Sequence, residues 1–374
     1  MRVIHLSKMT GAAGSEGHLL VLLAGLRQRG VDARLWILVE PDNPVQPYVD
    51  RVEALDIPVE RFVIHRHLDP GLWRRLAQGW RASQPDIVHT HLLHADLHGI
   101  PAARRAQVPH IVSSRHNDDA FRRKLPIRLL HRGLWRWTDA GIAISDAIRQ
   151  FTIEIEGVQP DKIQTVHYGL DPASVDAPPG ARTELSELVG LEPDALIVGS
   201  VCRLIEQKGL VYALRGFAQI ADEVPETHYV IAGDGKLRGE LEAETRTLGL
   251  TDRVHFLGWR DEPYTVFAAL DVFLAPSLWE GFGLVFLEAM ALHVPVIATR
   301  VSAIPEVVVD GETGWLVPPR DSDAIAAALR AALNNPAEVR ARGANGRRRL
   351  EQAFSPDVMV ERTLTIYREL EERG

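Results

Sequence analysis

Cysteine is nearly absent from this chain, since Cys202 is the only one in 374 residues. A single thiol excludes an internal disulfide framework and a zinc site built from several cysteines. The sequence also has no run of about 18 uncharged apolar residues that could span a bilayer, and its start lacks the features of a signal peptide. We therefore expect a cytoplasmic protein, which can still contact the inner face of a membrane peripherally.

The remaining composition is that of an ordinary globular protein, with 46% hydrophobic and 25% charged residues. A length of 374 residues exceeds one ordinary core and predicts two domains. The formal net charge is −8, although residues 1–170 carry more Lys and Arg than Asp and Glu. Ordinary variation between domains is the favoured explanation, and an anionic partner for the first half is the alternative.

Short runs rich in Val and Ile alternate with stretches of helical periodicity along the whole chain. This rhythm predicts βαβ units, parallel sheets and an α/β fold. The expected strands are 3–6, 33–39, 59–64, 87–90, 110–113 and 141–145 in the first half, and 196–201, 228–232, 254–257, 272–275 and 296–299 in the second.

A segment rich in Pro, Gly and acidic residues interrupts this rhythm as a linker does. Two doubly wound parallel-sheet domains in tandem place a ligand-binding cleft between the carboxyl ends of their sheets. The predicted parts are a Rossmann-like domain over 1–170, a linker over 171–194, a second Rossmann-like domain over 195–355 and a C-terminal helix over 356–374.

The most informative segment, 277–291, follows a predicted buried strand and opens a helix. Gly281 and Gly283 permit a tight turn, and the N–H groups at the helix start suit a phosphate. Glu280 and Glu288 flank this start, and a carboxylate that accepts two hydroxyls suits a sugar ring or a ribose diol. The alternative is a tight turn with two solvated acids.

Two cations, Arg203 and Lys208, lie in the loop after another predicted strand, and Gly209 begins the next helix. Arg grips phosphate oxygens through two N–H groups, and Lys supplies a point charge. Together they can neutralise a departing diphosphate without a metal. Two surface cations with no ligand are the alternative. The glycine-rich loop 10–17 lacks the spacing of a dinucleotide fingerprint, so we expect it only to bring backbone near a phosphate or an acceptor group.

These segments together resemble glycosyltransferase family 4, the retaining group with the two-domain GT-B fold. The departures are Cys202, where a glycine commonly precedes the arginine, and Ala13, which replaces the first glycine of a Gly-Gly pair. Neither removes a charged contact. The similarity runs nearly end to end, through 13–16, 168–171, 203–209, 232–235, 252–258, the Glu280-x7-Glu288 signature, 295–299, 306–308 and 310–318.

The resemblance implies that the domain over 1–170 is the acceptor side and that the domain over 195–355 binds the nucleotide-sugar donor. It implies that Arg203 and Lys208 hold the donor diphosphate. It also implies that Glu280 contacts hydroxyls of the transferred sugar and that Glu288 takes the ribose hydroxyls. The expected catalytic residues are His116, which would lie beside the transferred sugar, with Glu280, Arg203 and Lys208. The expected substrate-binding residues are Gly14, Arg203, Lys208, Glu280, Glu288 and the backbone N–H groups of Phe282, Gly283 and Leu284, and no metal ligands are expected.

The predicted function is a retaining, metal-independent hexosyltransferase that moves a sugar from a nucleotide diphosphate to a hydroxyl of a glycan, lipid-linked or small-molecule acceptor. No cofactor is implied, because the nucleotide sugar is a co-substrate, and UDP is the default nucleotide. One alternative is another GT-B nucleotide-sugar or phosphosugar enzyme, such as an epimerase or a phosphorylase. A catalytically silent sugar-nucleotide binding protein is disfavoured by the intact set of charged residues.

Other patterns have simpler explanations. His89, His91, His94 and His98 could hold zinc, but we expect them to line the cleft or an acceptor groove. The segment 121–137 mixes Arg and Lys with Leu, Ile and Trp and contains no acid. Core packing with the arginines outward is favoured there over contact with anionic lipid, and no nucleic-acid module accompanies the charge.

Overall fold

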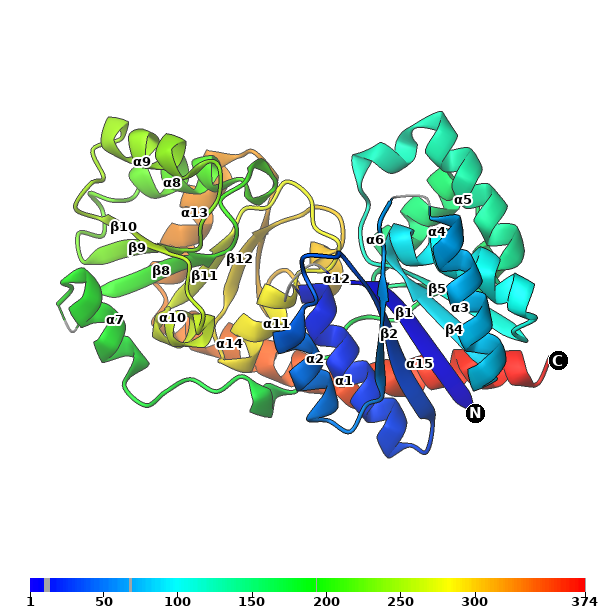
Figure 1. Cartoon of the computed structure of the whole chain (residues 1–374). Helices are drawn as coiled ribbons and strands as arrows, with labels where there is room; N and C mark the ends of the chain where they lie inside the picture. Colours follow the sequence, from blue (N-terminus) through cyan, green and yellow to red (C-terminus); the bar gives the residue numbers. More distant parts are fainter. Residues whose placement is uncertain (10–13, 67–68, 193, 374) are drawn as a thin grey trace. The chain divides into compact units, whose positions relative to one another are not determined.

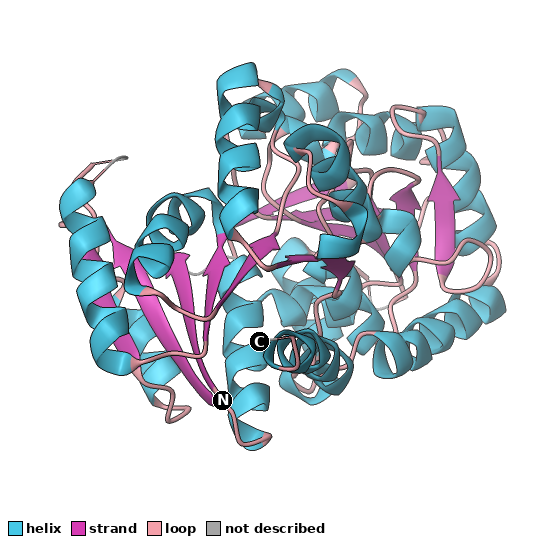
Figure 2. Cartoon of the chain, turned by 90° about the vertical axis from the view of Figure 1, so that its right-hand side faces the viewer, coloured by secondary structure: helices cyan, strands magenta, loops and turns pink. Residues whose placement is uncertain are grey.

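The chain forms two compact units, which a computed structural model describes over residues 1–9, 14–66, 69–192 and 194–373 (Figure 1). Unit 1 comprises Met1–Gly169 and the C-terminal segment from Pro356. Unit 2 comprises Leu170–Ser355. Each unit is a parallel sheet between layers of helices (Figure 2), so the expected α/β class with two Rossmann-like domains is confirmed.

Unit 1 contains a seven-stranded sheet in the order β3-β2-β1-β4-β5-β6-β7, and its recorded pairings are parallel. The central strands are buried on both faces, which explains their continuous Val, Ile and Leu content. Six strands match the expected ones, and the short β7 was not predicted. The strands are β1 (Arg2–Lys8), β2 (Asp32–Val39), β3 (Val59–Val63), β4 (Ile87–His91), β5 (His110–Arg115), β6 (Ala140–Ala143) and β7 (Ile163–Thr165).

The C-terminal helix α15 (Pro356–Glu371) belongs to unit 1, although 186 residues of unit 2 precede it in the chain. It packs against α1, where a Cβ on Gly25 would lie 2.5 Å from a methyl of Val360. The other helices of unit 1 are α1 (Gly14–Gln28), α2 (Gln46–Glu53), α3 (Pro70–Ser83), α4 (Leu92–Ala106), η1 (Ala120–Arg123), α5 (Leu125–Trp137), α6 (Asp146–Phe151), η2 (Thr152–Glu156) and η3 (Pro160–Lys162).

Unit 2 contains a six-stranded sheet in the order β10-β9-β8-β11-β12-β13, again with parallel pairings. Five strands match the expected ones, whereas β13 follows a short turn and was not predicted. The strands are β8 (Leu196–Val201), β9 (Thr227–Ala232), β10 (Val254–Gly258), β11 (Val272–Ala275), β12 (Val296–Thr299) and β13 (Gly314–Val317). The helices are η4 (Pro172–Ser174), α7 (Ala181–Val189), η5 (Glu206–Lys208), α8 (Leu210–Ala218), α9 (Arg238–Thr247), α10 (Pro263–Ala269), α11 (Leu284–Ala291), α12 (Ile304–Val307), α13 (Ser322–Leu333) and α14 (Pro336–Ala353).

The segment expected as a linker contains the folded helix α7, which packs on unit 2. Leu185 is 2% exposed, and the guanidinium of Arg182 donates to the carboxylate of Asp271 at 3.0 Å and to the carbonyl of Ala195 at 2.6 Å. Its Pro and Gly content therefore marks the turns around a helix, and much of the segment is part of the second unit. Among the described residues, no helix combines the length and the apolar character that crossing a bilayer requires.

Candidate functional site

Three neighbouring strands of unit 2 carry the sequence motifs at their carboxyl ends. In the sheet, β8 lies between β9 and β11. The loops that follow these strands therefore share one edge, which is where α/β sheets bind ligands. Arg203 and Lys208 lie in the loop after β8, Gly233 in the loop after β9, and Glu280 in the loop after β11.

The loop after β8 is bonded directly to the loop after β11. The backbone N–H of Leu278 donates to the carbonyl of Gln207 at 2.7 Å, and the Gln207 side-chain amide donates to the carbonyl of Trp279 at 3.0 Å. Gly209 has a φ of +61°, and a Cβ there would lie 2.2 Å from the carbonyl oxygen of Pro276. Position 209 thus requires glycine both for its backbone conformation and for the close approach of the two loops.

Lys208 and Glu280 form an ion pair at this junction, although they lie 72 residues apart in the sequence. The Lys208 Nζ lies 2.5 Å from the Glu280 Oε2, and the two side chains are 13% and 12% exposed. A short charge-assisted bond with this little exposure fixes both side chains. Because Glu280 already balances the charge of Lys208, an anion bound here needs further donors.

Arg203 is an exposed cation at this edge. Among the described residues, none is recorded as a hydrogen-bond or ion-pair partner of its guanidinium. Its backbone is held by the turn after β9, because the N–H of Leu204 donates to the carbonyl of Asp234 at 2.9 Å. A Cβ on Gly233 would lie 1.9 Å from the carbonyl oxygen of Cys202, so this turn packs closely against the loop.

Cys202, the departure noted in the sequence, lies next to these charges. Burial raises the pKa of its thiol to about 11, while Lys208, Glu280 and Arg203 all act on it electrostatically. The thiol is therefore protonated at neutral pH and does not serve as a nucleophile.

Helix α11 begins at Leu284, directly after Gly283, whose φ is +85°, and no side chain caps its first turn. Because the N–H of Phe286 already donates to the carbonyl of Gly283 at 3.0 Å, the N–H groups of Leu284 and Val285 are the ones that point out of the positive end of the helix dipole. The side chain of Phe282 is 1% exposed, and its ring centroid lies 5.8 Å from that of Phe354. Phe282 therefore anchors the turn in the core, and only its backbone is placed to meet a ligand.

Glu288 lies one turn into α11 and is half-buried. Burial raises the pKa of its carboxyl to about 7. No ion pair or hydrogen bond to its carboxylate is recorded among the described residues, in contrast to Glu280. A half-buried acid with a raised pKa and no recorded partner is a typical feature of a binding site.

His116 follows β5 in unit 1, and both of its ring nitrogens are engaged. Its Nε2 lies 3.1 Å from the Nδ1 of His91, and its Nδ1 lies 2.5 Å from the hydroxyl of Tyr168. Burial, followed by the charge of His18, lowers the pKa of His116 well below its usual value. A sugar hydroxyl can therefore bond to a ring nitrogen of His116 only by replacing one of these partners.

Arg115, the residue before His116, anchors this part of the chain through a buried network of ion pairs that the sequence did not reveal. The guanidinium of Arg115 donates to Asp96 at 2.6 Å and to Glu156 at 2.9 Å, and Arg122 also pairs with Glu156 at 2.6 Å. These side chains are at most 1% exposed. Paired charges at such depth fix the backbone that carries His116. Acids and arginines this far apart in the sequence gave no signal of their pairing.

Gly14 is the first residue of α1. The other glycine of the loop 10–17 before this helix, Gly11, lies outside the described residues, as do Thr10, Ala12 and Ala13. The expectation that Gly14 lies near a phosphate thus stays a prediction.

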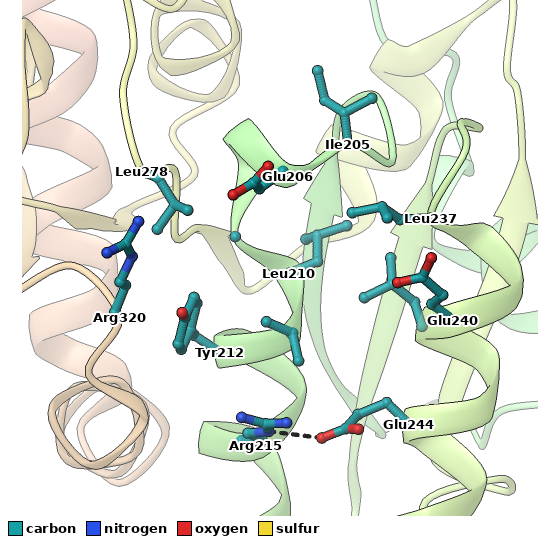
Figure 3. Close-up of a pocket in the computed structure, with 13 residues that line it drawn as sticks. Ile205, Glu206, Leu210, Tyr212, Arg215, Leu237, Glu240, Glu244, Leu278 and Arg320 are labelled. Carbon is teal, nitrogen blue, oxygen red and sulfur yellow. Dashed lines mark hydrogen bonds and ion pairs between the residues drawn. The ribbon is translucent and has the colours of Figure 1, made fainter.

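A separate cavity of about 410 Å³ lies beside the junction, between α8 and α9 (Figure 3). Leu210, Leu237 and Leu278 give it apolar walls, and Arg215 pairs with Glu244 at its end. Its lining includes Glu206 and Gly209 of the junction loop. The four charged residues predicted to bind the donor are not part of this lining, so the cavity is distinct from the proposed phosphate site.

The basic segment 121–137 has a buried face and an exposed one. His131, Leu134 and Trp135 of α5 pack into unit 1, as core packing predicts. On the other face Leu125 is 63% exposed, Leu129 56% and Trp137 49%. Exposed apolar side chains on one helix face are not explained by packing within the unit.

The four histidines grouped in the sequence separate in the structure. His89 and His91 lie on β4 and join His5, His18 and His116 in one cluster. His94 and His98 lie on α4, where His98 packs 6.3 Å from the ring of Trp73. Among the described residues, neither belongs to a group that could hold a metal ion.

Comparisons with known proteins match the two halves of the chain in succession. The model of "Glycosyltransferase Family 4" matches residues 12–174, and that of "Glycosyl transferases group 1" matches residues 182–349.

Curated relatives match across most of their length. The chain is 30% identical over 317 residues to the alpha-maltose-1-phosphate synthase of Mycobacterium tuberculosis, which covers 77% of this chain and 80% of that protein. It is 29% identical over 304 residues to the UDP-Gal:alpha-D-GlcNAc-diphosphoundecaprenol alpha-1,3-galactosyltransferase of Escherichia coli, with 78% of each chain covered. The crystal structure of Anabaena HepE in complex with UDP matches with a TM-score of 0.85 at 22% identity, over 99% of this chain and 100% of that one, which shows a shared fold.

Proposed function

Because the chain belongs to glycosyltransferase family 4, we propose that it is a retaining hexosyltransferase that needs no metal ion. Its two Rossmann-like units have the GT-B fold, and it uses a nucleotide sugar as donor. The observation that carries the proposal is the junction in unit 2. There two cations, an uncapped helix start and two carboxylates lie along neighbouring loops at one sheet edge.

The donor diphosphate binds at this junction in the proposal. The exposed guanidinium of Arg203 bonds two phosphate oxygens, and the first N–H groups of α11 bond others. Lys208 adds a point charge, which Glu280 holds in place. These donors replace the metal ion by which other enzymes neutralise a departing diphosphate.

The two carboxylates bind different hydroxyls. Glu280 is close enough to Lys208 to take hydroxyls of the sugar next to the diphosphate. Glu288 is one helical turn further on, and its carboxylate without a recorded partner takes the ribose diol. The backbone of Phe282, Gly283 and Leu284 completes the contact to sugar or phosphate.

Transfer proceeds on one face of the sugar ring. The acceptor oxygen forms a bond to the anomeric carbon as the bond to the diphosphate oxygen breaks, and the acceptor proton passes to the departing phosphate oxygen. Arg203, Lys208 and the helix start stabilise the charge that develops on the diphosphate. Gly14 approaches the phosphates, and His116 lies beside the transferred sugar after exchanging one ring-nitrogen partner for a sugar hydroxyl.

The name of one relative favours particular substrates. The E. coli relative uses UDP-galactose and a diphosphoundecaprenol-linked acceptor by its name, which supports a UDP-sugar and a lipid-linked acceptor for this chain. Such an acceptor would be met at a membrane surface. Leu125, Leu129 and Trp137 of α5, surrounded by exposed basic residues, supply the peripheral contact with anionic lipid at the cytoplasmic face.

The decisive experiment incubates the purified protein with UDP-, GDP- and ADP-sugars, with and without glycan and lipid-linked acceptors. Transfer releases free nucleoside diphosphate and extends the acceptor, whereas an epimerase converts the donor and a phosphorylase releases sugar phosphate. NMR of the product tests retention, because the anomeric configuration must equal that of the donor. Full activity after dialysis against EDTA tests metal independence, and loss of activity restored by Mg²⁺ would refute it.

A further inference from the structure

Five histidines from separate parts of the chain meet at one end of the sheet in unit 1. His5 of β1 pairs in register with His89 of β4, and His91 projects to the same side two residues later. His18 of α1 and His116 after β5 close the group, with ring centroids 5.0 Å apart. Sequence spacing could not reveal this cluster, because four elements contribute to it.

Three of these histidines converge on one point. The candidate ligand nitrogens of His18, His91 and His116 all lie within 4.8 Å of one another. The Nδ1 of His91 faces the Nε2 of His116 at 3.1 Å. In a tetrahedral site with metal–nitrogen bonds of about 2.0–2.1 Å, two ligand nitrogens lie about 3.4 Å apart. A metal ion can therefore enter between this pair with a movement of a few tenths of an ångström. The His18 nitrogen, which lies within 4.8 Å of both, joins them by a movement of up to about 1.4 Å.

The second ring nitrogens already have the partners that metal-binding histidines need. The Nε2 of His91 lies 3.0 Å from the Nδ1 of His5, whose Nε2 lies 3.3 Å from the hydroxyl of Tyr367. The Nδ1 of His116 lies 2.5 Å from the hydroxyl of Tyr168. Partners of this kind fix the ring orientation and the tautomer of a metal ligand.

We propose that His18, His91 and His116 bind one divalent transition-metal ion of the zinc class. Three imidazoles without a carboxylate or thiolate among them select zinc, cobalt, nickel or copper and disfavour Mg²⁺ and Ca²⁺, which prefer oxygen. A water molecule fills the fourth position. When the metal binds, the proton shared between His91 and His116 moves to the other nitrogen of its own ring. Neither neutral ring therefore has to lose a proton.

A second triad, His5, His89 and His91, is less suited. Both nitrogens of His89 already bond to Tyr367 and Ser114, at 2.6 Å and 2.7 Å.

The metal would not take part in transfer. If the proposed function is right, an ion on His116 keeps that ring from the sugar, so zinc inhibits transfer and a chelator restores it. This consequence rests on the proposed function, whereas metal binding itself does not. Zinc binding is measured on the protein alone, without donor or acceptor, so its outcome does not depend on whether the proposed function is right.

The test uses the full chain without a polyhistidine tag, freed of metal and titrated with Zn²⁺ against a fluorescent zinc chelator. We expect one equivalent to bind and Mg²⁺ to leave the signal unchanged. The variant His18→Asn should weaken zinc binding at least tenfold, and Tyr168→Phe should weaken it about 10- to 100-fold through the lost support of His116. The matched control is His255→Asn, because His255 and His228 also face each other at 3.1 Å but belong to no group of three among the described residues.

Equal zinc affinity in the wild type and in His18→Asn would overturn the proposal, as would the same loss in His255→Asn. Should His18→Asn fail to fold, the wild type bound to Co²⁺ remains decisive. The intense visible absorption of four- or five-coordinate cobalt is expected, and the weak absorption of six-coordinate cobalt would refute the site. Zinc that binds as proposed yet leaves transfer unaffected would count against the role of His116 in transfer and leave the metal site intact.

Discussion

The substitution Gly209→Ala tests whether the joined loops of unit 2 form the donor site. A Cβ at this position would lie 2.2 Å from the carbonyl oxygen of Pro276, and real Cβ atoms essentially never approach another atom closer than 3.0 Å. The two loops must therefore separate by at least 0.8 Å. This motion lengthens the hydrogen bond from the N–H of Leu278 to the carbonyl of Gln207, so it also displaces Lys208 from Glu280.

The size of the effect follows from this displacement. A misplacement of about 1 Å in groups that position a substrate costs up to about 100-fold in rate. We therefore expect kcat/KM to fall by about 10- to 100-fold, which corresponds to about 1.4–2.7 kcal/mol. The left-handed backbone at 209 adds a stability cost of about 1–2 kcal/mol for alanine.

The matched control is Gly249→Ala in the same unit. Gly249 has a φ of +71°, close to the +61° of Gly209, but a Cβ there meets nothing within 4 Å. Both variants bear the backbone cost, for which we expect a fall in Tm of about 2–4 °C per kcal/mol. Only Gly209→Ala bears the clash as well.

The assay compares kcat/KM for a nucleotide sugar and the Kd of the nucleoside diphosphate across the two variants, beside their Tm. Gly249→Ala should keep kcat/KM within about twofold of the wild type. If Gly209→Ala instead kept the wild-type kcat/KM and Kd while losing no more Tm than the control, the junction would not be where the donor binds.

Three further predictions concern the proposed binding groups. Lys208→Ala should lower turnover at least tenfold with the circular dichroism spectrum unchanged, and wild-type turnover would remove the lysine from the site. Because the pKa of Glu288 is raised to about 7, its carboxylate is ionised above and neutral below that pH, so the affinity for a nucleotide sugar should rise by about tenfold from pH 6 to pH 8. Glu288→Gln should abolish this rise, and an unchanged pH profile in that variant would show that another group titrates. Leu125→Glu with Leu129→Glu should abolish binding to vesicles of anionic lipid, which in the wild type should fall with salt, whereas no wild-type binding at low salt would refute the membrane contact.

Local chemistry explains which elements of the fold could be predicted from the sequence. Buried parallel strands are continuous apolar runs bounded by Gly and Pro, so most of the strands could be located without a structure. The helices that begin at Asp146 and Ser322 are capped by Ser145 and Asp321, which accept hydrogen bonds from the N–H groups of Ile148 and Ala324, and such caps depend only on neighbouring residues. The strand β7 is only three residues long, too short to give a pattern.

The sequence by itself determined the α/β class, the family and the residue types of the proposed donor site, because these depend on short segments whose glycines, cations and carboxylates act within a loop. Only the tertiary structure decided which of those segments meet. The ion pair of Lys208 with Glu280 follows from the strand order β9-β8-β11, and the histidine cluster from the register of β1 against β4. Both depend on the pairing of strands distant in the chain, which arises from the packing of the whole unit and which no local pattern records.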